Sequence, residues 1–105
     1  MRIQTDPQKD SAAGVVPTAP WRVVSVRVLD GYRLSARFVD GTEGEVDLSR
    51  LVMGERAGVF EALRNPAVFA QAHIEYGAVT WPGEIDIAPD AMHHEIKQNG
   101  KWVLE

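Results

Sequence analysis

Residues 32–48 read YRLSARFVDGTEGEVDL, with apolar and polar residues alternating on both sides of an Asp-Gly pair. This pattern is typical of two half-buried strands joined by a tight turn. A two-residue loop would place acidic residues on the apolar face, because a shift of one residue turns every side chain over. A three-residue loop over 39–41 instead pairs Leu34 with Val46 and puts Gly41 at the left-handed third position. We therefore predict an antiparallel hairpin with one apolar face.

A third strand is predicted before this hairpin. Its apolar residues, which alternate with polar ones, are Val24, Val26 and Val28. A loop over 29–31 would set Val28 opposite Tyr32 and complete a three-stranded antiparallel meander. The remaining pairs expected across the apolar face are Phe38 with Thr42, Ala36 with Gly44, and Tyr32 with Leu48.

The opposite face of the meander is charged. The register sets Arg37 opposite Glu43 and Arg33 opposite Asp47, and each such pair contributes ~0.2–1 kcal/mol. It also sets Arg27 opposite Arg33, which is unfavourable. Three arginines beside three acids make a nearly neutral face, which is poor for phosphate contacts, so a solvent-exposed charge ladder is the simpler interpretation. A transcription-associated protein that binds DNA through these arginines is the second alternative function.

Short helices and short strands are predicted downstream. A helical turn is expected near 48–52, short helices over 58–64 and after Asn65-Pro66, strands over 73–76 and 78–82, and a helix over 89–98. The residues expected to share one apolar face of their element are Val59, Phe60 and Leu63, then Ile74 and Tyr76, and then Val79 and Trp81. The residues expected to face the core from the last helix are Met92 and Ile96. The predicted fold class is α+β: a three-stranded antiparallel meander plus further short strands, packed against short helices.

Residues 21–105 are expected to form a single α+β domain, because 105 residues and 11.6 kDa cannot fill two cores. Residues 1–20 hold three prolines and no sustained period, which predicts a flexible or loosely docked N-terminal tail. The apolar patch over 102–104 is expected to dock on the domain or on a partner.

The composition limits the function classes. With 11 Lys+Arg against 15 Asp+Glu, the net charge is −4, which disfavours a strongly basic nucleic-acid binder. The absence of cysteine excludes disulfides, thiolate zinc sites and a cysteine nucleophile. No apolar run approaches the ~20 residues that span a bilayer, and no apolar stretch follows Arg2. We therefore expect a cytoplasmic protein with no membrane partner.

The stretch from Arg22 to about Glu95 resembles a small bacterial family, domain of unknown function family 2442. The most diagnostic segment is residues 79–90, VTWPGEIDIAPD. The other matching features are Val24 to Val28 with Tyr32-Arg33-Leu34, Phe38 to Gly41 with Gly44 to Leu48, Gly58-Val59-Phe60 with Leu63, and Phe69.

The resemblance implies an α+β domain whose antiparallel sheet packs on short helices. It implies no activity, because the family has no established catalytic residues. Some members join this domain to a C-terminal helix-turn-helix that binds DNA; only nine residues follow Ile96, so we expect no such module here. Many single-domain members look like products of short two-gene units, which is compatible with an antitoxin or accessory subunit.

The loop over 81–90 and the helix after it hold the candidate chemistry. Asp86 and Asp90 could act with Glu84 as paired carboxylates, or Asp86 could simply cap the helix. His93 and His94 are adjacent, so one helix points them about 100° apart and cannot easily aim both at one ion. We predict no metal site and no cofactor. A small-molecule, metal-binding or enzymatic role for this loop is the first alternative function.

Three tryptophans in so short a chain favour protein binding. Trp21 opens the first strand, Trp102 lies near the C-terminus, and Trp81 lies in the diagnostic segment. Tryptophan is enriched at binding hot spots, although all three could instead complete a thin core. Together with open strand edges, these residues favour a non-catalytic interaction or regulatory module that acts through a protein partner or self-association, including a homodimer.

Overall fold

The hairpin predicted for residues 32–48 is present in the computed structural model, which describes residues 19–105. Its strands are β2 (Arg33–Phe38) and β3 (Glu43–Asp47). The pairs of Leu34 with Val46 and Ala36 with Gly44 are confirmed. The tail predicted for residues 1–20 lies almost wholly outside the described residues.

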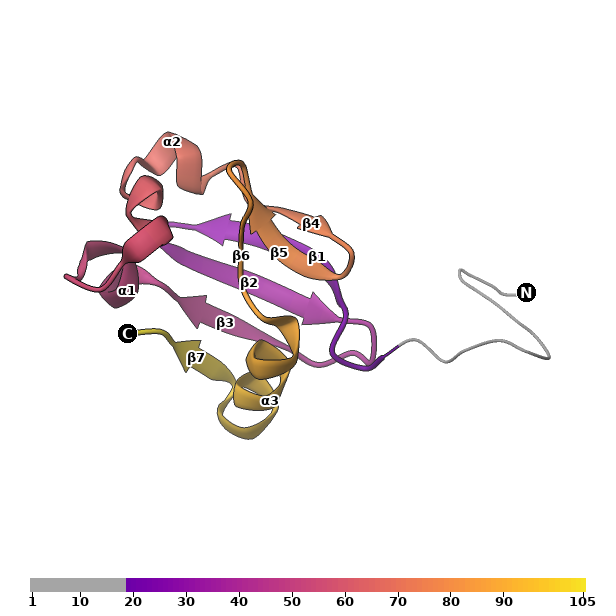
Figure 1. Cartoon of the computed structure of the whole chain (residues 1–105). Coiled ribbons are helices and arrows are strands. Elements are labelled where there is room, and N and C mark those ends of the chain that lie inside the picture. The colour runs from indigo at the N-terminus through magenta and orange to yellow at the C-terminus, as the bar shows by residue number, and fades with distance from the viewer. Residues whose placement is uncertain (1–18) are drawn as a thin grey trace.

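Two sheets and a set of short helices make up the fold (Figure 1). The larger sheet has the order β1-β2-β3-β7, where β1 is Val23–Leu29 and β7 is Lys101–Val103. The smaller sheet has the order β4-β5-β6, with bounds His73–Glu75, Ala78–Trp81 and Ile85–Asp86. The helices are α1 (Ser49–Met53), a 3-10 helix (Gly58–Arg64), α2 (Pro66–Phe69) and α3 (Pro89–Asn99). The predicted α+β class is confirmed.

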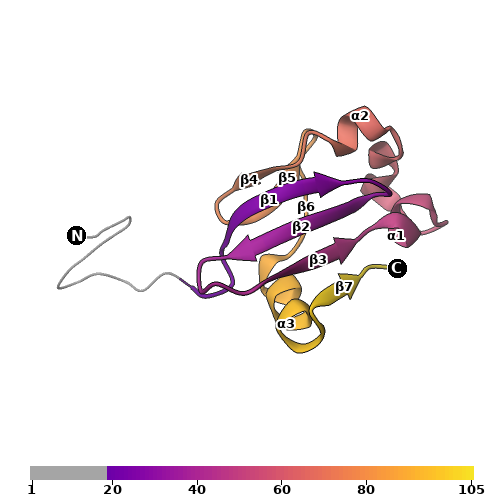
Figure 2. The same ribbon diagram turned by 180° about the vertical axis from the view of Figure 1, so that it is seen from behind.

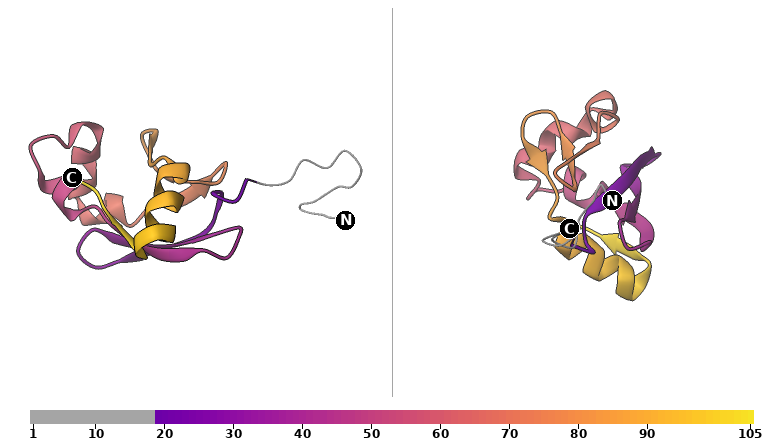
Figure 3. Two further views of the ribbon diagram at one scale, coloured as in Figure 1. Left: turned by 90° about the horizontal axis from the view of Figure 1, so that it is seen from below. Right: turned by 90° about the vertical axis from the view of Figure 1, so that its right-hand side faces the viewer.

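One face of the larger sheet is covered and the other is open. The helices and the smaller sheet lie on a single side of it (Figure 3). Seen from behind, β1, β2 and β3 have nothing in front of them (Figure 2). The core lies between the layers and consists of Val23, Leu34, Ala36, Phe38, Val46, Leu48, Val52, Leu63, Phe69, Val79, Trp81, Ile85, Ile87, Met92 and Ile96.

The expected register of β1 against β2 is wrong by two residues. Val28 lies opposite Leu34, not Tyr32, and Arg27 lies opposite Ser35, not Arg33. The cause is the turn: Tyr32 has φ 59° and so belongs to the loop rather than to the strand. Because the shift is even, the inward-facing residues stay inward, but the neighbours of each charged residue change.

A β-bulge also alters the start of β1. The register shifts between Val23 and Ser25, so Val23 is buried and Val24 is 49% exposed. The prediction that Val24 shares the apolar face is therefore wrong. Two further residues expected to share an apolar face with their neighbours are also exposed, Tyr76 in the β4–β5 turn and Val59 on the 3-10 helix. The inward positions of Val79, Trp81, Met92 and Ile96 are confirmed.

The helix ends follow from local sequence. Asn65 caps α2 by accepting a hydrogen bond from the Ala67 amide at 2.9 Å, with Pro66 in the first turn. Helix α3 begins at Pro89 and ends at Asn99, and Gly100, with a φ of 77°, supplies the left-handed cap. The chain then reverses into β7, which pairs parallel to β3. The terminal apolar patch thus docks on the domain, with Trp102 beside Val46.

Candidate binding site

An open hollow of about 500 Å³ lies where the start of β1 meets the smaller sheet. Two aromatic residues and four carboxylates line it, together with smaller side chains. We call it the aromatic–acidic hollow, and define it by Trp21, Tyr76, Glu75, Glu84, Asp86 and Asp90.

Two tight turns position these side chains. Tyr76 and Gly77 both have positive φ in the β4–β5 turn, and Glu84 has φ 64° in the β5–β6 turn. The Val23 amide donates to the Gly77 carbonyl at 2.8 Å, which ties the first turn to β1. Tyr76 is 91% exposed. The hollow is thus lined by a tyrosine and a glutamate whose backbones both have the left-handed conformation. This conformation is rare for residues other than glycine and persists only where the surrounding structure holds it.

The hollow carries negative charge. Glu75 accepts a hydrogen bond from His73 at 2.6 Å. A hydrogen bond to the Gln71 carbonyl, and then the contact with Glu75, raises the pKa of His73. Within residues 19–105, Glu84, Asp86 and Asp90 form no ion pair. The charged residues that line the hollow are therefore all acidic.

The structure brings only some of the proposed site residues together. Trp21, Asp86 and Asp90 line the hollow, whereas Trp81 is buried and its Nε1 donates to the Phe69 carbonyl at 2.9 Å. Trp102 lies in β7 opposite Val46 and does not line the hollow. The interpretation of Asp86 as a helix cap is wrong, since it lies in β6 and the α3 cap position makes no side-chain bond.

The two histidines have different environments. His94 is exposed, whereas His93 is half-buried and its ring meets that of Phe38 edge-on at 5.0 Å. The Nε2 atom of His93 lies 2.9 Å from Oδ2 of Asp40, and Lys97 approaches the same carboxylate at 3.9 Å. This contact joins α3 to the β2–β3 turn. Spacing along the helix could not indicate this contact, because Asp40 lies 53 residues before His93 in the sequence.

The Asp40–His93 contact makes stability depend on pH. The hydrogen bond from His93, followed by that from the Thr42 amide, holds the pKa of Asp40 well below its ordinary value of 3.8. A depressed pKa stabilises the fold above the unfolded-state value, and this contribution is lost as pH falls below 3.8. We expect Asp40→Asn to be less stable than wild type near neutral pH and to approach it in acid.

Urea unfolding across the acidic range measures this difference. Asp30→Asn is the matched control, because the Asp30 side chain forms no hydrogen bond within residues 19–105. A stability gap for Asp40→Asn that stayed constant with pH, or an equal gap for Asp30→Asn, would contradict the assignment.

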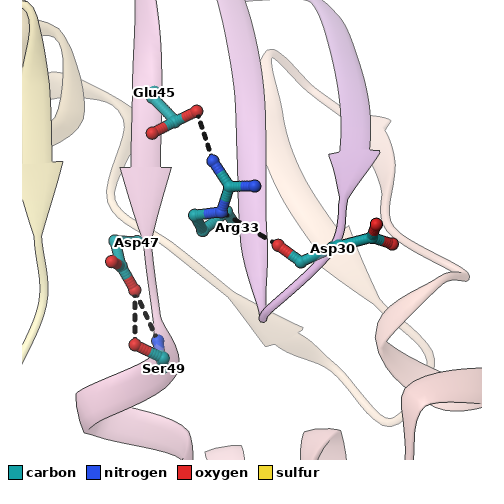
Figure 4. A network of polar contacts seen from close by, with 5 residues as sticks. All are labelled: Asp30, Arg33, Glu45, Asp47 and Ser49. Atoms are coloured by element: carbon teal, nitrogen blue, oxygen red, sulfur yellow. Dashed lines mark hydrogen bonds and ion pairs between the residues drawn. The ribbon is translucent and has the colours of Figure 1, made fainter.

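The open face of the larger sheet carries a polar network (Figure 4). Arg33 donates to Glu45 at 2.8 Å and to the Asp30 carbonyl at 2.9 Å. Asp47 accepts from the amide and hydroxyl of Ser49 at 2.9 and 2.7 Å, and the hydroxyl bond is the main reason its pKa is lowered. The backbone of Arg33 lies opposite Asp47, as predicted. The side chain of Arg33, however, pairs with Glu45, which lies diagonally across the two strands.

Two kinds of feature are absent from residues 19–105. No group of three or more His, Asp or Glu side chains in this part of the chain is arranged to hold a metal ion. None of its helices combines the length and the apolar character needed to cross a membrane.

Comparison with known proteins identifies the family. A family model described as protein of unknown function (DUF2442) matches residues 23–98. The chain belongs to this family. The DUF2442 region runs from β1 almost to the end of α3, so it includes every residue of the aromatic–acidic hollow except Trp21. No curated protein and no solved structure gives a significant match.

Proposed function

We propose that this DUF2442 chain is a non-catalytic protein-interaction module, and that the aromatic–acidic hollow receives a lysine or arginine side chain of a protein partner. One observation supports this most: two exposed aromatic residues, Trp21 and Tyr76, flank a hollow whose charged lining groups are all carboxylates. Aromatic anchors beside complementary charge are typical of binding hot spots.

The chemistry favours a cation as the occupant. An aromatic face attracts a cation with about 0.5–1 kcal/mol at an exposed site, and more once water is excluded. The carboxylates of Glu84, Asp86 and Asp90 would add charge-assisted hydrogen bonds to an ammonium or guanidinium group. A basic side chain of a partner would thus be stabilised by the aromatic rings and by the carboxylates at the same time.

If the module is regulatory, the chain would act as an antitoxin-like or accessory subunit of a bacterial cytoplasmic complex. Self-association is the other way the module could act, and a second copy would then supply the basic side chain. A small organic cation is a further occupant to test, because the hollow has a volume of about 500 Å³, within the usual range for small-molecule sites.

A fluorescence titration with a labelled lysine- and arginine-rich peptide tests the proposal. We expect binding that weakens as salt is added, and a loss of about tenfold in affinity for Trp21→Ala or for the Asp86→Asn/Asp90→Asn double variant. Tyr76→Ala is expected to weaken binding as well.

The matched control is Val59→Ala, which removes an apolar side chain that is 68% exposed on the 3-10 helix, outside the hollow. Equal binding by wild type and Trp21→Ala would overturn the proposal, as would equal losses for Tyr76→Ala and Val59→Ala. A small quaternary ammonium ion that binds more tightly than the peptide would replace the protein partner by a small ligand.

A further inference from the structure

Four residues form a chequered block on the open face of the larger sheet. Ser25 on β1 lies opposite Arg37 on β2, and Arg27 lies opposite Ser35. The two arginines therefore occupy one diagonal of the block and the two serines the other. A shallow hollow of about 300 Å³ is lined by these four residues and by Glu43. We call this arrangement the serine–arginine block.

The observed register leaves this block positively charged. Two acids of β3 have other partners, because Glu45 pairs with Arg33 and Asp47 is bound by Ser49. Two acids of β3 lie beside the block: Glu43 opposite Arg37, and Glu45 opposite Ser35. Because Glu45 is paired with Arg33, Glu43 is the acid that lines the hollow of the block. Among the described residues, neither Arg27 nor Arg37 takes part in an ion pair.

We propose that the serine–arginine block binds a carboxylate of an acidic segment on a protein partner. A guanidinium group presents parallel N–H donors that match the two oxygens of a carboxylate. The hydroxyl groups of Ser25 and Ser35 supply two further donors at the other corners. With two arginines and one glutamate, the local charge is complementary to a single anionic group.

An acidic protein segment fits better than nucleic acid. The chain as a whole has a net charge of −4, which repels a long polyanion more strongly than a short segment with one or two carboxylates. A protein that makes about 6–10 phosphate contacts to a duplex needs many basic groups, whereas the block offers two arginines. A short acidic stretch with one or two carboxylates in reach matches the size and charge of the block.

This inference goes beyond the proposed function and does not depend on it. The block and the aromatic–acidic hollow share no residue, and they attract opposite charges. A failure of the lysine-rich peptide to bind the hollow therefore leaves the block untouched. A failure at the block leaves the hollow untouched in the same way.

Nuclear magnetic resonance titration of the isotope-labelled chain with a glutamate-rich peptide tests the block. We expect shifts of the Arg27 and Arg37 side-chain Nε–H signals, and a loss of about fivefold or more in affinity for Arg27→Gln and for Arg37→Gln. Glu43→Gln is expected to tighten binding, because it removes the acidic side chain that lines the hollow together with the two arginines. Arg56→Gln, an exposed arginine outside the block, controls for the change in net charge.

The same titration with inorganic phosphate and with an oligonucleotide distinguishes the sources of the anion. The proposal predicts that the glutamate-rich peptide binds at least as tightly as either. Equal losses for Arg27→Gln and Arg56→Gln would overturn it, as would an absence of shifts at Arg27 and Arg37. Tighter binding of the oligonucleotide, with a steep dependence on salt, would overturn the choice of a protein partner.

Discussion

Trp81→Ala is expected to lower the free energy of unfolding by about 3–5 kcal/mol. Trp81 is 1% exposed, and its ring packs against Phe69 with centroids 5.7 Å apart. The substitution leaves a large cavity between the two sheets and also leaves the Phe69 carbonyl without the indole donor. Urea unfolding followed by circular dichroism measures the loss without relying on tryptophan emission.

Trp21→Ala is the matched control for this variant. Trp21 is 38% exposed and lies at the hollow, so its removal is expected to change stability by less than about 1 kcal/mol. Comparable losses for the two variants would contradict the division between a structural and a surface tryptophan.

Gly44→Ala is expected to destabilise the fold by about 1–3 kcal/mol or more. A Cβ atom at this position in β3 would lie 2.5 Å from the Gly100 carbonyl oxygen and 2.6 Å from Cγ2 of Ile96. Ile96 could adjust its rotamer, but the Gly100 carbonyl belongs to the backbone that ends α3, so the helix end itself must move. Chemical unfolding of the variant measures the effect.

Glu43→Ala provides the comparison within the same strand, since Glu43 is exposed and its side chain lies on the open face. We expect a change within about 0.5 kcal/mol for this variant. If Gly44→Ala proved as stable as Glu43→Ala, the close approach of α3 and β7 to β3 would be wrong.

The β2–β3 hairpin could be predicted because one apolar face admits a single register. The β1–β2 register could not, because the left-handed conformation of Tyr32 is rare for a tyrosine and the alternating pattern placed it in the strand. The pairing of β7 with β3 could not be predicted from the sequence either. It joins segments more than 50 residues apart, and three residues carry too little periodicity to indicate a strand.

The candidate site, too, could be predicted from the sequence only in part. The acidic loop and Trp21 stood out in the sequence, and Trp21, Asp86 and Asp90 do line one hollow. Glu75 and Tyr76 were missed as site residues, although a tyrosine before glycine between two predicted strands could have indicated an exposed turn. Their meeting with Trp21 depends on the bond from β1 to Gly77, which no local pattern encodes.

Acid-to-amine crosslinking of the chain bound to its partner in host cells tests the proposed function most directly. A carbodiimide joins a carboxylate to a lysine only where the two are in contact, so the crosslinked residues report the contact surface. We predict that partner lysines are joined to Glu84, Asp86 or Asp90, and that Trp21→Ala removes these crosslinks. Crosslinks confined to acids outside the aromatic–acidic hollow, or unchanged in Trp21→Ala, would contradict the assignment of this hollow as the docking site.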